Sequence, residues 1–219
     1  MMVKIDYISD VLCVWAWAAE ARNEELMSNF DGQVELIPKF INLFGSTEAR
    51  IGQGWKEKGG FEGFAKHTIE VVDKFPELAL NPRVWSEVRP TSSMTAHLYL
   101  KAAQLSGADN RQILQLASSL RHAFFVEAKD ISCSKEISAV FVAQGIDISA
   151  LFPFLEDGSA YALLWEDQLL RESQQIKGSP SYLLDGGRQT LFGNVGYRVI
   201  EANINELLNP GPKEGASWC

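Results

Sequence analysis

Cys13 is the residue of this chain best placed for nucleophilic chemistry. It lies in the stretch Asp-Val-Leu-Cys-Val-Trp-Ala-Trp, residues 10–17, between a predicted strand and a predicted helix. A helix start offers unpaired N–H groups and the positive end of the helix dipole, and both stabilise a thiolate. This position can lower a thiol pKa from about 8.5, and the thiolate is the nucleophile. A buried structural cysteine fits the position equally well, because cysteine also packs as a small hydrophobe.

The elements around Cys13 form a strand–helix–strand unit. Residues 3–8 alternate in polarity and predict a half-buried strand, whereas residues 16–30 lack Pro and Gly and predict a helix. Residues 33–43 predict a second strand, in which Pro38 indicates a sheet edge or a strand end. Such a unit implies that the two strands pair in parallel.

The middle of the chain predicts mostly helices. Residues 44–63 hold six of the 17 glycines but no Gly-Lys-Ser/Thr sequence, so we expect a mobile loop near the active face and no phosphate-binding loop. A short helix should follow over residues 61–75. Further predicted helices run from Pro90 to Gly107, from Asn110 to Phe124, from Ser134 to Gly145 and from Ser159 to Ile176, with a short piece at 149–155.

The last part of the chain returns to strands. Residues 181–184 and 189–192 predict a hairpin around the turn Asp185-Gly186-Gly187. A final helix should begin at Gly193-Asn194, and its predicted buried side holds Val199, Ile200, Ile204, Leu207 and Leu208.

Composition excludes several classes of partner. The chain has 219 residues with 28 acidic and 20 basic side chains, a formal net charge of −8, so we expect it to bind neither nucleic acid nor an anionic membrane. It has no run of about 18 apolar residues, which argues against a membrane-spanning helix. No secretory signal is recognised, and three cysteines do not form a disulfide framework, so a cytoplasmic location is expected.

The other candidate ligands and thiols favour structural interpretations. His67, His97 and His122 are far apart in predicted helices and lack the paired spacing of a zinc site, so no metal is expected. Cys133 could act as a distant resolving thiol, but an incidental role is favoured, as it is for Cys219.

Three segments resemble a known family. Residues 10–17 resemble the Asp-Phe-x-Cys-Pro-Trp-Cys-Tyr start of DsbA-like thioredoxin-fold proteins, particularly FrnE-like oxidoreductases. Kappa-class glutathione transferases and 2-hydroxychromene-2-carboxylate isomerases are relatives of that subgroup. Residues 176–182 are similar to the Gly-Val-Pro-Thr-Phe segment, whose proline is cis, and residues 125–131 look like a segment of the helical insertion. The resemblance spans roughly Val3 to Leu208.

The resemblance implies an α/β, thioredoxin-like fold with a helical insertion domain. Residues 1–45 and 160–210 would form a discontinuous thioredoxin-like domain, residues 46–159 a mostly helical insertion, and residues 211–219 a flexible tail. It also implies a DsbA-family thiol–disulfide oxidoreductase or protein disulfide isomerase.

The resemblance assigns roles to two groups of residues. Cys13 is the expected nucleophile, and backbone N–H groups near Trp15 and Ala16 are expected to stabilise its thiolate. The backbone of Ser179, before a cis Pro180, is expected to pair with the substrate strand. No cofactor is required, and glutathione is a candidate co-substrate. The implied partners are protein or peptide thiols and disulfides, or glutathione, and a homodimer is compatible with them.

Two departures from the family pattern shape the functional prediction. Ala16 replaces the second cysteine of the Cys-x-x-Cys pair, and Val14, in the expected substrate-binding segment, replaces its proline. We therefore expect a monothiol mechanism through Cys13. One alternative is a glutathione-dependent transferase or isomerase of kappa type, in which Cys13 contacts the glutathione sulfur. The other is a redox-inactive binding module.

Overall fold

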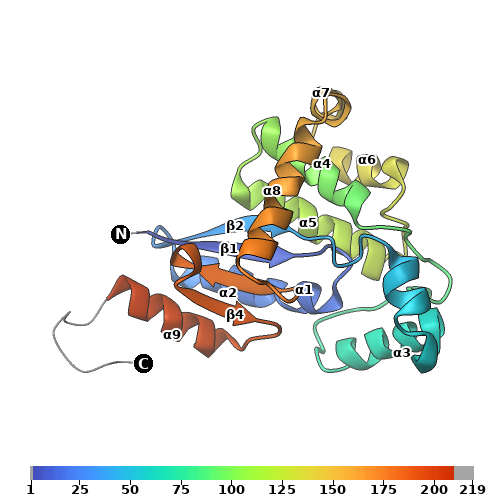
Figure 1. Cartoon of the computed structure of the whole chain (residues 1–219), viewed down its shortest axis with the longest axis horizontal. Helices are drawn as coiled ribbons and strands as arrows, with labels where there is room; N and C mark the ends of the chain where they lie inside the picture. The colour runs from blue at the N-terminus through green and yellow to red at the C-terminus, as the bar shows by residue number, and fades with distance from the viewer. Residues whose placement is uncertain (1, 210–219) are drawn as a thin grey trace.

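A computed structural model describes residues 2–209 and contains a four-stranded mixed sheet among nine α-helices in that range (Figure 1). The strands are β1 (Val3–Ser9), β2 (Val34–Phe40), β3 (Ser181–Leu184) and β4 (Gln189–Phe192), in the order β2-β1-β3-β4. β1 pairs in parallel with β2, as predicted, and antiparallel with β3. β2 is an edge strand, which agrees with the Pro38 signal.

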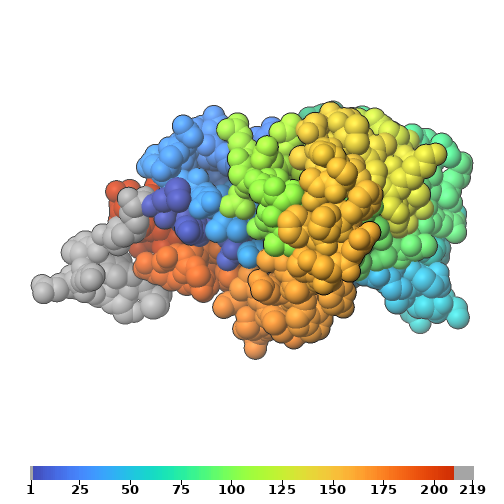
Figure 2. All heavy atoms as spheres, turned by 90° about the horizontal axis from the view of Figure 1, so that it is seen from above, coloured from blue at the N-terminus to red at the C-terminus, as the bar shows by residue number. Residues whose placement is uncertain are grey.

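Two short helices, α1 (Val14–Ala18) and α2 (Glu20–Asn29), follow β1, and α9 (Tyr197–Leu208) follows β4. Between β2 and β3 lie the remaining helices: α3 (Gly60–Val72), α4 (Met94–Leu105), α5 (Asn110–Phe125), α6 (Ser134–Ala143), α7 (Phe152–Glu156) and α8 (Ser159–Ser173). In Figure 2 the atoms of residues 110–173, coloured from yellow-green to orange, lie together on one side of the molecule.

The two faces of the sheet have different covers. One face packs against α2 and α9 through a cluster that includes Ile5, Leu26 and Ile204. The other face contributes Ile8 and Leu183 to a smaller cluster with α8. β1 therefore contributes apolar side chains to both faces of the sheet, because successive side chains of a strand point in opposite directions.

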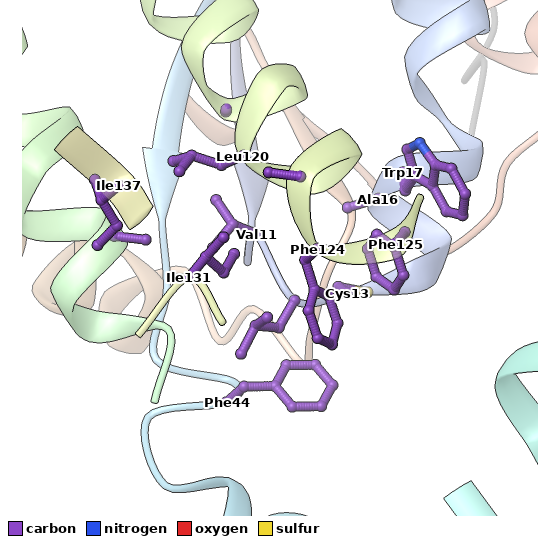
Figure 3. Packing of buried hydrophobic residues seen from close by; sticks show 14 of the residues in the cluster. Val11, Cys13, Ala16, Trp17, Phe44, Leu120, Phe124, Phe125, Ile131 and Ile137 are labelled. Atoms are coloured by element: carbon purple, nitrogen blue, oxygen red, sulfur yellow. The ribbon is translucent and has the colours of Figure 1, made fainter. Parts of the chain in front are cut away.

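The largest core joins the insertion helices to the start of α1. This core contains residues 11–14, Ala16 and Trp17, which pack with side chains from α4, α5 and α6 (Figure 3). The rings of Trp17 and Phe125 stack with their centroids 4.6 Å apart and an interplanar angle of 2°. The segment that carries Cys13 is thus held by the insertion as well as by the sheet.

The end of the edge strand β2 is covered by polar side chains of α8. The Phe40 N–H donates to Asp167 Oδ2 over 2.7 Å, and Gln168 Nε2 donates to the Phe40 carbonyl over 2.8 Å. Asp167 also contacts the ammonium group of Lys101 at 2.6 Å. These contacts satisfy backbone groups that an edge strand would otherwise leave unpaired.

Several predicted boundaries need correction. The single helix expected over 16–30 is divided at Ala19, whose N–H bonds to the carbonyls of both Trp15 and Trp17. Residues 48–53, expected as a loop, form a π-helical segment. The segment ends where the Gly54 N–H donates to the Ala49 carbonyl. Glycine is required at position 54, because a Cβ there would clash with the Arg50 carbonyl oxygen.

The helix starts also shift. The cap of α5 is Asp109, not Asn110, because its carboxylate accepts the Gln112 N–H in a capping box. The cap of α6 is Cys133 rather than Ser134. Residues 193–196 form a turn before α9, in which Gly193 has φ +81°. Val199 of α9 is 48% exposed and not buried as predicted, because it lies outside the helix face formed by Ile200, Ile204 and Leu207. The predicted tail 211–219 and Cys219 lie outside the described residues.

Among residues 2–209, no single helix is long and apolar enough to cross a membrane. One bent pair of helices would be long and apolar enough if the two were combined: Ser134–Ala143 with Ile148–Glu156.

Candidate functional site

Cys13 occupies the N-cap position of α1, directly after the turn that follows β1. Its backbone is extended, with φ −85° and ψ 114°, and its carbonyl accepts the N–H groups of Ala16 and Trp17. The residue is 4% exposed, because the hydrophobic core of the insertion surrounds it. The predicted strand-to-helix position is therefore correct, and Cys13 is also more enclosed than that position alone requires.

The structure brings Cys13 together with the predicted segment before β3. The Cys13 thiol donates to the Ser179 carbonyl oxygen over 3.2 Å. The Asp10 N–H donates to Ser179 Oγ over 3.0 Å. The Ser179–Pro180 peptide bond is cis, the conformation that the resemblance implies. Residues that are 166 positions apart in the sequence thus form one site at the end of β1.

The acidity of Cys13 differs from the expectation for a helix start. Burial is the largest influence and raises the pKa of the thiol, and the charge of Asp10 raises it further. The Ser179 side chain and the backbone N–H groups of Ala16 and Trp15 act in the opposite direction, because hydrogen bonds from them favour the thiolate. The expected backbone donors are present, but the loss of solvent outweighs them.

Asp10 connects four segments around the nucleophile. Its side-chain oxygens accept the Leu12 N–H over 2.9 Å, the Phe44 N–H over 2.8 Å and the Ser93 hydroxyl over 2.8 Å. Burial raises the pKa of Asp10 to about 6, although these hydrogen bonds favour the ionised form. Asp10 therefore fixes the turn that presents Cys13, using partners from the loop after β2 and from the segment before α4.

His97 completes this buried network as a neutral acceptor. Its Nε2 accepts the Val11 N–H over 3.2 Å, and its ring stacks on Phe40. Burial lowers the pKa of His97 to about 3, so the ring is uncharged near neutral pH.

Among residues 2–209 no group of three or more His, Cys, Asp or Glu side chains is arranged to hold a metal ion.

The three residues after Cys13 differ in what they present to a ligand. Val14 is 6% exposed and Ala16 is fully buried, so neither side chain presents a surface to a ligand. The Tyr7 hydroxyl donates to the Ala16 carbonyl over 3.2 Å. Trp15 is half-buried against the edge of Phe75 and is the side chain of this group that reaches the surface.

Cys133 is a free, exposed cysteine at the N-cap of α6. His67 and His122 lie in α3 and α5, as expected.

Sequence reasoning did not assign a role to Asp10, Ser93 or His97. Asp10 was visible as an acidic residue between a buried strand and an apolar segment, three positions before the nucleophile. Ser93 and His97 carried no comparable signal, because only the folded chain brings α4 against the end of β1.

The fold and the site define a thioredoxin-like protein with a helical insertion. The model of the DSBA-like thioredoxin domain family matches residues 4–205, so the chain belongs to this family. This confirms the fold and the family that the sequence resembles.

Solved structures share the fold at low sequence identity. A probable DsbA oxidoreductase from Streptomyces coelicolor superposes with a TM-score of 0.75 at 17% identity, covering 98% of this chain and 94% of that chain. The cytosolic disulfide reductase DsbM from Pseudomonas aeruginosa, solved with GSH, gives 0.66 at 15%, covering 92% and 99%. A 2-hydroxychromene-2-carboxylate isomerase gives 0.63 at 16%, covering 94% and 96%.

Proposed function

We propose that this protein catalyses thiol–disulfide exchange by a monothiol mechanism through Cys13. The observation that carries the proposal is the contact of 3.2 Å between the Cys13 thiol and the Ser179 carbonyl, with Ala16 where a second thiol would stand. The Cys13 thiolate attacks one sulfur of a disulfide, and the other sulfur leaves as a thiolate. A thiolate from outside the protein then attacks the mixed disulfide, which releases Cys13 and forms a new disulfide.

Ionisation of Cys13 and substrate binding are linked in this mechanism. In the resting site the Cys13 thiol donates a hydrogen bond to the Ser179 carbonyl oxygen. When the proton leaves, this carbonyl becomes free to accept an N–H from an extended substrate backbone. The N–H groups of Trp15 and Ala16 hold the sulfur anion. No cofactor takes part, and Val14 and Pro180 border the backbone groups that the substrate meets.

Glutathione is the co-substrate that fits this proposal best, because a monothiol enzyme needs an external thiol. The structure of the similar DsbM with GSH supports this choice. A reducing compartment such as the cytoplasm would supply that thiol. Protein and peptide disulfides are the other proposed substrates.

The test uses oxidised glutathione and intact mass spectrometry, followed by peptide mapping. A monothiol enzyme gains one glutathione on Cys13, and an added thiol removes it. Cys13→Ser should lose this adduct, whereas Cys133→Ser should keep it. Loss of two hydrogens from the wild type, without an adduct on Cys13, would show a hidden resolving cysteine and refute the monothiol mechanism.

A glutathione-dependent transferase or isomerase is the second candidate, and the raised pKa of Cys13 favours it. A protonated thiol can donate a hydrogen bond to a bound glutathione thiolate instead of attacking a disulfide. The two candidates differ in Cys13→Ser, since a serine hydroxyl can donate but cannot form a disulfide. Conjugation of glutathione to chlorodinitrobenzene that survives in Cys13→Ser would favour the transferase, and loss of glutathionylated-peptide reduction in the same variant would favour exchange.

A further inference from the structure

Arg50 is held over the loop that supports the Cys13 turn. It lies on the π-helical segment Glu48–Gln53, and its guanidinium carbon is 4.8 Å from the ring centroid of Phe44. The Phe44 N–H donates to Asp10 Oδ2 over 2.8 Å. Phe44 and Cys13 belong to the same packed cluster, as Figure 3 shows. Arg50 thus contacts the ring of a residue whose backbone N–H is bonded to Asp10, three positions before the nucleophile.

Arg171 reaches the same loop from α8. Its Nη1 donates to Asn42 Oδ1 over 2.6 Å, and Asn42 is two residues before Phe44. Two guanidinium groups from separate elements therefore converge on residues 42–44, immediately after β2.

Charges of both signs act on Arg50. Burial lowers the pKa of Arg50, the charges of Cys13 and Asp10 raise it, and Arg171 lowers it, so all four groups are within electrostatic reach. Within residues 2–209, neither Arg50 nor Arg171 forms an ion pair with a carboxylate, as is also the case for Arg188. The charges of Arg50 and Arg171 repel each other, and an anion bound between them would relieve this repulsion.

We propose that Arg50 and Arg171 form an anion-recognition pair at the rim of the Cys13 site, which selects disulfides that carry a carboxylate near the sulfur. The inference rests on the proposed exchange function and names the determinant of its substrate class. Guanidinium groups suit this role because their planar N–H donors match a carboxylate. The Asn42 contact and the Phe44 ring hold the two side chains in place before the substrate arrives.

The test compares two small symmetric disulfides that differ in charge: dithiodipropionate, which has carboxylates, and bis(hydroxyethyl) disulfide, which is neutral. The rate of mixed-disulfide formation on Cys13 is measured by quenched-flow mass spectrometry in a background with Cys133→Ser and Cys219→Ser. The variants are Arg50→Gln and Arg171→Gln. The matched control is Arg188→Gln, which removes the same charge from an exposed position in the turn between β3 and β4, at the far end of the sheet.

The wild type should react faster with the carboxylate disulfide than with the neutral one. Arg50→Gln and Arg171→Gln should each slow the carboxylate disulfide by about tenfold more than the neutral disulfide, because any effect on the Cys13 thiolate is common to both disulfides whereas attraction of the substrate acts only on the charged one. Arg188→Gln should change neither rate by more than about twofold, since salt screens distant charges.

Three outcomes would overturn the inference: equal wild-type rates with both disulfides, equal slowing of both disulfides by Arg50→Gln and Arg171→Gln, or an effect of Arg188→Gln as large as theirs. Reaction with the neutral disulfide alone would overturn the arginine pair and leave the exchange function intact. Absence of any mixed disulfide on Cys13 would instead refute the exchange function itself.

Discussion

The buried ion pair between Lys101 and Asp167 allows a quantitative prediction about stability. Both side chains are 1% exposed, and the Lys101 Nζ lies 2.6 Å from Asp167 Oδ2. The same oxygen accepts the Phe40 N–H over 2.7 Å, and the Lys39 Nζ lies 3.7 Å from Oδ1. One carboxylate thus neutralises a buried ammonium group and satisfies the edge of the sheet.

Asp167→Asn removes the charge and keeps both the size of the side chain and an oxygen acceptor for Phe40. Lys101 is then a buried ammonium group without a counter-charge. Breaking a buried pair in this way costs about 3–5 kcal/mol of unfolding free energy. For a chain of this size, each kcal/mol shifts the melting temperature by about 2–4 °C, so we expect a decrease of about 6–20 °C.

Urea unfolding and thermal melting followed by circular dichroism measure this change. The double variant Lys101→Met with Asp167→Asn should recover most of the loss, because it removes the unpaired ammonium and keeps the acceptor for Phe40. Glu62→Gln, which breaks the exposed pair with Arg89, is the matched control and should cost less than about 1 kcal/mol. The reasoning is refuted if Asp167→Asn costs no more than Glu62→Gln, or if the double variant is no more stable than Asp167→Asn.

Three further predictions concern the site. The folded-state pKa of Asp10 is raised to about 6, so between pH values of about 4 and 6 the folded chain keeps a proton that the unfolded chain releases. The free energy of unfolding should therefore fall by roughly 3 kcal/mol as the pH rises through this range. Asp10→Asn should flatten this dependence in urea titrations across that range. Tyr7→Phe leaves the Ala16 carbonyl without its hydroxyl donor and should cost about 1 kcal/mol in the same assay; a loss below about 0.3 kcal/mol would contradict that role. Ala16→Cys should form an internal disulfide with Cys13, seen as a loss of two hydrogens by mass spectrometry, and a persistent glutathione adduct on this variant would contradict the geometry.

Local patterns were sufficient to predict the strands and most helices. The alternation in residues 3–8 and the Asp185-Gly186-Gly187 turn correspond to β1 and to the β3–β4 hairpin. The parallel pairing of β1 with β2 follows from the helical connection between them. Errors at the helix ends arose where a neighbouring residue made the better cap, as Asp109 does for α5.

The acidity of Cys13 could not be predicted from its position. A helix start is a local feature, and it correctly indicated donors from Trp15 and Ala16. The burial that opposes these donors comes from the loop after β2, with Phe44, and from the insertion, with Phe124, and the sequence places both far from Cys13. Local spacing shows which groups can stabilise a thiolate, but only the tertiary fold determines how much water the thiol loses.

Asp10 illustrates the same limit for hydrogen bonding. Its side-chain partners at Leu12, Phe44 and Ser93 come from three segments, and only the Leu12 contact is local. A buried carboxylate with three donors holds these segments in register, because each donor would otherwise lose a hydrogen bond on burial. The role of Asp10 therefore depends on the packing of α4 and of the loop after β2, which no spacing in residues 10–17 encodes.

The packing of Ala16 connects the single-thiol site to substrate choice. Ala16 is fully buried, its carbonyl accepts the Tyr7 hydroxyl, and it provides no sulfur beside Cys13. In the proposed mechanism the resolving thiol must therefore enter from solvent, and the groups at the rim act on it as well as on the first disulfide. Arg50 and Arg171 would then favour anionic thiols in both half-reactions, which makes the rim charge a determinant of the whole catalytic cycle.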